Sequence, residues 1–169
     1  MAKKPIKADQ GIKDGVSDKV YTPDEVAKYL INLLPIKDSD VLLDPCRGQG
    51  AFYNNFPELN IKLYCEIDEG IDFFNFNDKV DWIITNPPYS IYDAFVKHCF
   101  ELSNNVALLV PFSKVSSSMK RIKAIKEYGG IKNIWFLSAA RCGFPFGFPC
   151  GFIWYQRGYN DSWNVIEKI

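Results

Sequence analysis

The stretch "DVLLDPCRGQGAF", residues 40–52, decides how the chain is expected to fold. Its first half is a short apolar run, typical of a buried strand, that ends at the carboxylate of Asp44. Gly48 and Gly50 follow, and they permit a tight turn and a close approach of another group to the backbone. We expect a brief helix at 51–56, so the stretch predicts the first strand–turn–helix step of an α/β sheet.

Strand-like and helix-like segments alternate along the rest of the chain. Strands are expected at 40–44, 61–68, 80–85, 105–111, 131–137 and 151–158, with a short extended piece at 71–74. Helices are expected at 23–34, 91–102 and 117–129. This order predicts an open α/β sheet that is parallel at least in its first half.

The first of these helices carries its own start signal. Thr22 suits the N-cap, Pro23 the first helical position and Glu25 the third, which is a capping-box arrangement. Residues 1–19 are rich in Lys, Asp and Gly without periodicity, so we expect a flexible N-terminal arm there. Residues 20–169 are then expected to form a single domain, which is long enough to bury a real core.

Composition argues against several classes of function. The 20 basic and 20 acidic side chains cancel, so no global electrostatic footprint for nucleic acid is visible. Five cysteines without a CxxC pair favour free thiols in a reducing cytoplasm and disfavour a metal site. The only histidine, His98, is expected to pack on a helical face. No apolar run approaches the ~20 residues of a membrane span, and the N-terminus lacks the apolar core of a signal peptide.

Two acidic residues stand at the ends of consecutive strands. Asp44 lies beside the glycine turn, and Glu66 lies at the end of the next strand. In open α/β sheets, ligands bind outside the carboxyl ends of the strands, and a carboxylate in this second position accepts hydrogen bonds from ribose hydroxyls. The pair therefore predicts a nucleotide-type ligand, although two merely polar strand ends would leave the same pattern. A phosphate-binding GxxxxGK[ST] motif does not occur.

The tetrapeptide Asn86-Pro87-Pro88-Tyr89 follows the strand at 80–85. Its prolines stop ladder pairing and hold the backbone extended. Two neutral oxygens, the Asn86 side-chain carbonyl and the Pro87 backbone carbonyl, suit gripping an NH2 group through both of its hydrogens. Tyr89 is able to stack on the planar ring that bears the amine. Because Asn-Pro-Pro is also a good strand-to-loop breaker, both interpretations stay open on these residues alone.

Taken together, the stretches resemble the S-adenosylmethionine-dependent amino-methyltransferases, above all the DNA adenine-N6 methyltransferases. NPPY looks like their catalytic motif, DPCRGQGAF like the loop at the methionine end of the cofactor, and EID like the ribose-binding motif. YTPDEVAKYL resembles the motif that closes over the methionine moiety, and FPFGFPCGFIWYQR (144–157) resembles the late loop whose aromatic residue packs on the extruded base.

The resemblance covers about residues 20–158 and implies a fold and a set of roles. The implied fold is a Rossmann-like class I methyltransferase domain, a mostly parallel seven-stranded sheet with a late antiparallel hairpin and helices on both faces. The implied catalytic residues are Asn86, Pro87 and Tyr89. The implied S-adenosylmethionine-binding residues are Tyr21, Thr22, Pro23, Asp44, Pro45, Gly48, Gly50, Glu66, Ile67, Asp72, Phe73 and Asn86. The implied substrate-binding residues are Tyr89 and one of Phe144, Phe146 and Phe148, and Lys114, in the loop at 112–120, is a further candidate for a phosphate contact.

The acceptor of the methyl group stays open. DNA methyltransferases of this type usually carry a target-recognition domain, and none is expected here. A local basic cluster offers phosphate contacts or is simply a solvated helix face, and it consists of Lys114, Lys120, Arg121, Lys123 and Lys126. The expected partner is nucleic acid, DNA first, with recognition from the chain's own loops, from another copy or from a specificity subunit. The alternatives are methylation of RNA or of protein glutamine, a non-catalytic cofactor-binding subunit, and an enzyme that degrades S-adenosylmethionine.

Overall fold

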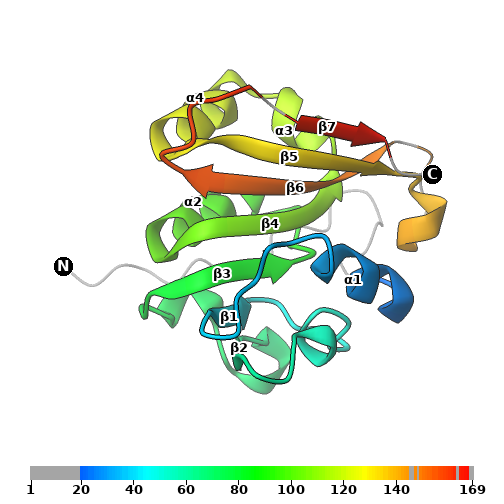
Figure 1. Ribbon diagram of the computed structural model, residues 1–169, viewed down its shortest axis with the longest axis vertical. Coiled ribbons are helices and arrows are strands. Elements are labelled where there is room, and N and C mark those ends of the chain that lie inside the picture. The colour runs from blue at the N-terminus through cyan, green and yellow to red at the C-terminus, as the bar shows by residue number, and fades with distance from the viewer. Residues whose placement is uncertain (1–19, 145–146, 148, 163, 168–169) are drawn as a thin grey trace.

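A seven-stranded sheet runs through the middle of the computed structural model, which describes residues 20–144, 147, 149–162 and 164–167 (Figure 1). The strands are β1 (Val41–Asp44), β2 (Ile61–Tyr64), β3 (Val80–Thr85), β4 (Ser103–Pro111), β5 (Gly129–Leu137), β6 (Cys150–Arg157) and β7 (Asn164–Glu167). The α-helices are α1 (Asp24–Ile31), α2 (Tyr92–Leu102), α3 (Ser113–Ser116) and α4 (Met119–Tyr128). The expected arm at 1–19 lies outside the described residues, as do Phe146 and Phe148.

The order of the strands places a ligand site. Across the sheet it is β2-β1-β3-β4-β6-β5-β7, and β6 alone runs antiparallel to its neighbours among the described strands. The chain goes from β1 to β2 on one side and then crosses to β3 on the other side of β1. Such a reversal leaves a crevice at the carboxyl ends of the two strands that flank it, here β1 and β3. The α/β sheet predicted from the sequence is confirmed.

Two expectations for the strands and short helices are wrong. The piece at 71–74 is not a strand of the sheet, because only Ile71 forms an isolated bridge, with Glu66, and Phe73–Asn75 is a turn of 3-10 helix. The seventh strand is instead β7, which pairs in parallel with β5 at the far edge. The helix expected at 51–56 is reduced to one 3-10 turn, Tyr53–Asn55.

The capping box expected at the first helix is also absent. Pro23 stands at the N-cap with an extended ψ of 140°, α1 begins at Asp24, and no side chain caps the helix. The Thr22 hydroxyl is engaged elsewhere, where it accepts a hydrogen bond from Asn86 Nδ2 at 3.3 Å. A tertiary contact has therefore replaced the local one that the sequence suggested.

The core is split between the two faces of the sheet, because successive strand residues point to opposite sides. On one face, α1 packs with the buried side chains of Leu42 and Trp82. On the other face, α2 packs with those of Leu43 and Ile83. The strands between them are thus fixed from both sides, and their carboxyl ends form a rigid rim.

His98 and the cysteines behave as structural groups. The His98 ring lies 4.7 Å from the Phe73 ring, and its Nε2 lies 2.9 Å from the Phe76 carbonyl oxygen. All five cysteines are free thiols. In the part of the chain that the structure describes, no group of three or more His, Cys, Asp or Glu side chains is placed to hold a metal ion. None of the described helices is long and apolar enough to cross a membrane.

Candidate active site

The glycine turn after β1 is held by the acidic residue after β2. Gly48 N donates a hydrogen bond to Glu66 Oε2 at 2.6 Å, and Asp68 N donates to Glu66 Oε1 at 3.0 Å. Gly48 and Gly50 have φ of +53° and +89°, a region that side chains rarely adopt, so glycine is required at both positions. The Tyr21 ring lies against Gly48, where an added Cβ would come within 3.3 Å of it. These four predicted cofactor-binding residues are therefore brought together at one edge.

Asp44 is the most perturbed carboxylate of this rim. It is 1% exposed, and it accepts a hydrogen bond from Thr85 Oγ1, at the end of neighbouring β3, at 2.7 Å. Burial raises the pKa of Asp44 to about 7, because the charged form loses its hydration; the Thr85 bond opposes this rise without cancelling it. A buried carboxyl poised between its two states at neutral pH is typical of a functional site.

Cys46 joins the glycine turn to the NPPY segment. Its Sγ lies 3.0 Å from Thr85 Oγ1 and donates to the Asn86 carbonyl oxygen at 3.2 Å. Burial raises the pKa of the Cys46 thiol well above its usual range, so the thiol stays protonated and keeps this donor. The two loops that follow β1 and β3 are thereby tied to each other.

The Asn86 side chain has a different partner at each end. Its Nδ2 donates to the Val20 carbonyl oxygen at 3.1 Å and to Thr22 Oγ1 at 3.3 Å. Its Oδ1 accepts a hydrogen bond from the Tyr89 hydroxyl at 2.8 Å. Burial raises the pKa of the Tyr89 phenol, so this hydroxyl remains a donor at every physiological pH. The oxygen that was expected to grip an amine is thus occupied by a group that is itself an O–H donor.

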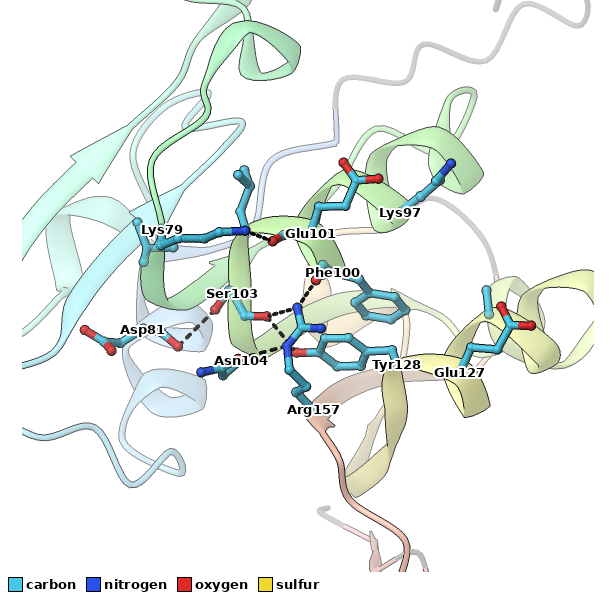
Figure 2. Close-up of a pocket in the computed structure, with 13 residues that line it drawn as sticks. Lys79, Asp81, Lys97, Phe100, Glu101, Ser103, Asn104, Glu127, Tyr128 and Arg157 are labelled. Atoms are coloured by element: carbon cyan, nitrogen blue, oxygen red, sulfur yellow. Dashed lines mark hydrogen bonds between the residues drawn. The ribbon is translucent and has the colours of Figure 1, made fainter.

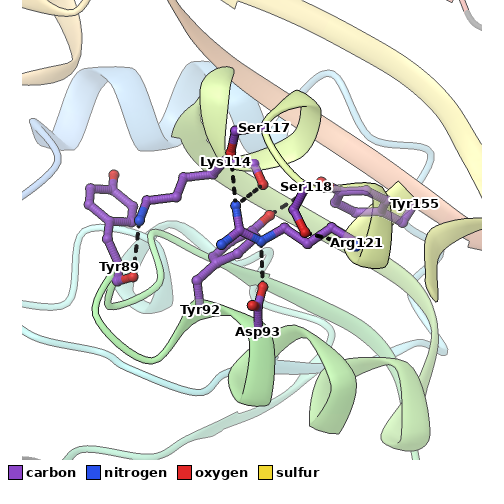
Figure 3. Close-up of polar contacts among 8 residues, drawn as sticks. All are labelled: Tyr89, Tyr92, Asp93, Lys114, Ser117, Ser118, Arg121 and Tyr155. Atoms are coloured by element: carbon purple, nitrogen blue, oxygen red, sulfur yellow. Dashed lines mark hydrogen bonds and ion pairs between the residues drawn. The ribbon is translucent and has the colours of Figure 1, made fainter. Parts of the chain in front are cut away.

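Tyr89 lies between an aromatic ring and a cation. Its ring centroid is 6.1 Å from that of Phe144, in an edge-to-face arrangement, so Phe144 is placed next to the NPPY segment. Lys114 Nζ donates to the Tyr89 carbonyl oxygen at 3.1 Å and lies 5.7 Å from the Tyr89 ring (Figure 3). Lys114 therefore supports the NPPY segment, and the substrate contact that the sequence suggested for it stays a prediction.

Arg121 holds the backbone of Lys114 in place. Its Nη1 donates to the Lys114 carbonyl oxygen at 2.9 Å, and its Nε pairs with Asp93 near the start of α2, as Figure 3 shows. Lys123 lies 3.8 Å from Glu127 along α4. The basic cluster expected from the sequence is therefore divided, because Arg121 bridges α4 and α2 while Lys120 remains exposed to solvent.

The other predicted residues surround this rim. Pro45 and Pro87 are buried and stiffen the two loops, whereas Ile67 exposes 57% of its surface beside Glu66. Asp72 Oδ1 accepts from Phe74 N at 3.0 Å and so caps a 3-10 turn. Phe73 is 5% exposed and packs on α2, so its side chain belongs to the core, and its carbonyl oxygen lies 3.2 Å from His98 Nε2.

Sequence reasoning missed two residues of the site, Cys46 and Thr85, and it missed the bridging role of Arg121. Thr85 had a usable signal, since a polar residue ending the strand beside Asp44 was placed to meet that carboxylate. Arg121 had none, because its partners Asp93 and Lys114 come together only when α4 packs on α2.

The pockets of the structure do not identify the site either. One of about 340 Å³ lies between α2 and α4, and one of about 800 Å³ lies at the opposite end of the sheet (Figure 2).

Comparisons with known proteins find structural likeness without sequence likeness. No protein-family model and no curated protein matches the chain. The M protein of the type I restriction enzyme EcoKI matches with a TM-score of 0.65 at 14% identity, over 85% of this chain and 45% of that protein. A putative class I S-adenosylmethionine-dependent methyltransferase from Listeria monocytogenes matches at 0.69 and 15%, over 93% and 68%. The 23S rRNA methyltransferase ErmE matches at 0.63 and 11%, over 83% and 71%.

These identities establish the fold alone, and the chain spans less than half the length of the EcoKI M protein. The strand order of this chain, with its reversal between β1 and β3, belongs to an α/β sheet that binds ligands at the carboxyl ends of its strands. The chain has the fold of the class I S-adenosylmethionine-dependent methyltransferases.

Proposed function

We propose that this chain is an S-adenosylmethionine-dependent methyltransferase that acts on an exocyclic amine, the N6 amine of adenine in DNA. The observation that carries the proposal is the meeting of two loops at the carboxyl end of the sheet. The glycine turn held by Glu66 follows β1, and the NPPY segment with Asn86 follows the adjacent strand β3. A cofactor site and an amine clamp placed side by side are what direct methyl transfer requires.

The residues present fit S-adenosylmethionine. Each of the two Glu66 carboxylate oxygens accepts one backbone N–H, and each keeps a lone pair for a ribose hydroxyl. The Asp44 carboxyl group is buried with a pKa of about 7, and in its ionised form it would pair with the ammonium group of the methionine end. Tyr21 and Ile67 are exposed apolar groups on either side of this edge. When bound, the cofactor supplies an electrophilic methyl group on a sulfonium.

The chain's own residues would then prepare the amine. The amine of adenine is a poor nucleophile, because its lone pair is delocalised into the ring. Hydrogen bonds from its two protons to Asn86 Oδ1 and to the Pro87 carbonyl oxygen draw the nitrogen toward a tetrahedral shape and free that lone pair. The N–C bond forms as the S–C bond breaks, and the positive charge that develops on nitrogen faces two neutral oxygens. One proton then leaves the nitrogen for solvent.

The acceptor must displace one bond that the free protein makes. Asn86 Oδ1 holds the Tyr89 hydroxyl at 2.8 Å, so the amine takes its place as the Tyr89 ring turns to stack on the base. The Phe144 ring lies edge-to-face with the Tyr89 ring, 6.1 Å between centroids, and would pack beside the same base. A base in duplex DNA has to leave its stack to reach this point, and aromatic side chains compensate for part of the stacking it loses.

RNA is the second candidate acceptor. The observation that favours it is the structural likeness to a 23S rRNA methyltransferase, whose TM-score of 0.63 is only slightly below the 0.65 of the EcoKI M protein. Surface charge does not separate the two, since exposed Lys120 would serve either backbone. Recognition of the sequence on either polymer is assigned, within this proposal, to a specificity subunit or to another copy of the chain.

A transfer assay separates these acceptors. The purified chain is incubated with S-adenosylmethionine that carries a tritiated methyl group, together with DNA, RNA or denatured protein. We expect label in DNA, none in protein, and none in any polymer with the Asn86→Ala variant. Label in RNA alone would move the proposal to its second candidate. Consumption of the cofactor without any labelled polymer would replace the proposal with a degrading enzyme.

A further inference from the structure

The side-chain amide of Asn86 is fixed in one of its two orientations. A backbone carbonyl only accepts hydrogen bonds, so the end of the amide that lies 3.1 Å from the Val20 oxygen has to be the NH2 group. Thr22 Oγ1 accepts the second proton of the same group at 3.3 Å. Both N–H donors of Asn86 are thereby used, and Oδ1 is turned the other way, toward the Tyr89 hydroxyl.

This orientation matters because the flipped amide would be useless. Turned by 180°, Asn86 would present N–H groups to an incoming amine and two donors would face each other. The flipped form would also set Oδ1 against the Val20 carbonyl oxygen, where two acceptors repel. The amide is thus preorganised by its N–H end, while its oxygen remains the end that exchanges partners.

We propose that Thr22 is a positioning residue for catalysis, which acts with the Val20 carbonyl to hold Asn86 Oδ1 toward the acceptor amine. This inference rests on the proposed function, and it gives Thr22 a role in place of the cofactor contact implied by the sequence. Thr22 is 8% exposed, so its hydroxyl is largely shielded from solvent and depends on Asn86 for a partner.

The segment that carries Thr22 is held close to Gly143. Gly143, which precedes Phe144, has a φ of +77°, and an added Cβ there would come within 2.9 Å of the Tyr21 carbonyl oxygen. Such a close approach fixes the backbone on one side of Thr22. Pro23 stiffens the other side and leads directly into α1. Residues 20–22 therefore form a rigid bracket for the catalytic amide.

Kinetics of two Thr22 variants test the proposal. Thr22→Val keeps the shape and removes the acceptor, and we expect kcat at saturating cofactor to fall about tenfold, the effect of one lost hydrogen bond. Thr22→Ser keeps the hydroxyl and is expected to restore kcat to within about twofold of the wild type. The Kd for S-adenosylmethionine should stay within about threefold in both. A Thr22→Val variant with unchanged kcat but weakened cofactor binding would overturn the proposal and make Thr22 a cofactor ligand only.

A second measurement needs no turnover, so it separates failure of this inference from failure of the proposed function. In protein labelled with 15N-asparagine, the Asn86 side-chain amide signals are assigned by their loss in Asn86→Asp. We expect both amide protons to exchange slowly with water, and one to exchange faster in Thr22→Val. Asn60 is the internal control, because its Nδ2 donates to the Lys37 and Asp40 carbonyl oxygens at 2.7 and 2.8 Å, far from Thr22. Unchanged exchange at Asn86 in Thr22→Val would overturn the inference.

Discussion

The two ends of the sheet differ in what their polar groups are doing. The larger pocket, about 800 Å³, lies at the end where β3 and β4 begin, and Figure 2 shows Arg157 crossing it. Arg157 Nε donates to Asn104 Oδ1 at 2.8 Å, and its Nη2 bonds the carbonyl oxygens of Phe100 and Ser103. Lys79 Nζ bonds the Glu101 carbonyl oxygen. These charged groups join the ends of elements to each other, which is a stabilising role.

At the carboxyl end the polar groups are held in states that a ligand would change. Asp44 is buried with a pKa of about 7, and Asn86 Oδ1 is bonded to a hydroxyl that is able to turn away. Under the proposed function, the larger hollow is not the site, so the size of a hollow is a poor guide to function. Convergence of displaceable hydrogen bonds and a perturbed carboxyl is a better one.

The largest expected effect is at Asn86. Asn86→Ala removes the oxygen that accepts from the amine, and we expect kcat to fall by about 10²- to 10³-fold, as for loss of one transition-state hydrogen-bonding group. The Kd for S-adenosylmethionine, measured by calorimetry, should change by less than about threefold, because the lost hydrogen bond is made to the amine that receives the methyl group and not to the cofactor. Asn104→Ala at the other end is the matched control and should keep wild-type kcat. If kcat falls equally in Asn86→Ala and Asn104→Ala, the two ends of the sheet do not differ in their contribution to catalysis.

The next effect is a pH dependence that belongs to Asp44. Its pKa rises from 3.8 in the unfolded chain to about 7 in the folded protein. The protonated form therefore stabilises the fold fully below pH 3.8, and this contribution is lost as pH rises through 7. Asp44→Asn has no titrating carboxyl at this position and lacks this loss. The unfolding free energy of Asp44→Asn minus that of the wild type should therefore rise by up to about 4 kcal/mol from pH 4 to pH 8.

Urea denaturation of the cofactor-free protein at these two pH values measures that difference. If the unfolding free energies of Asp44→Asn and the wild type differ by the same amount at pH 4 and at pH 8, the raised pKa of Asp44 is contradicted. Saturating cofactor should reduce the pH dependence of the wild type, since an ammonium group beside Asp44 favours the ionised carboxylate.

Arg157 should affect stability without affecting chemistry. Arg157→Met removes its hydrogen bonds to Asn104, Phe100 and Ser103, and we expect the unfolding free energy to fall by about 1 to 2 kcal/mol. Under conditions where the variant is folded, kcat should equal that of the wild type. Thermal denaturation together with single-turnover kinetics checks both statements. A folded Arg157→Met variant with impaired methyl transfer would show that the larger pocket takes part in function.

The smallest expected effect is at Tyr89. Tyr89→Phe removes the hydroxyl that occupies Asn86 Oδ1 while keeping the ring, so the acceptor no longer has to displace it. We expect KM for the acceptor to fall about threefold, somewhat less than the value of one net hydrogen bond, with kcat changed by less than twofold. Tyr92→Phe is the control, because that hydroxyl lies 3.4 Å from Tyr155 Oη and outside the site. A rise in KM for Tyr89→Phe would show that the hydroxyl binds the substrate.

Local patterns were enough to predict which polar residues meet at the carboxyl edge of the sheet but not the hydrogen bonds between them. Asp44, Glu66 and Asn86 were expected there because each ends or follows a recognisable strand, and parallel strands bring such ends to one edge. Their roles in binding and catalysis stay a prediction. The piece at 71–74 failed because strand propensity does not reveal whether a neighbouring edge accepts it. The expected cap at Thr22 failed because the same hydroxyl met Asn86, a residue 64 positions away. Contacts of that length are decided by packing, which no window of sequence contains.

The most direct test of the central claim is to find where the methyl group goes. Adenine-containing DNA is incubated with the wild-type chain and S-adenosylmethionine that carries a trideuterated methyl group, and its nucleosides are then analysed by mass spectrometry. An amine clamp at the carboxyl end of the sheet predicts trideuterated N6-methyladenine with the wild type and with Asn104→Ala, and none with Asn86→Ala. Trideuterated adenine at the same level with Asn86→Ala, or a label carried on ring carbon instead of the amine, would contradict it.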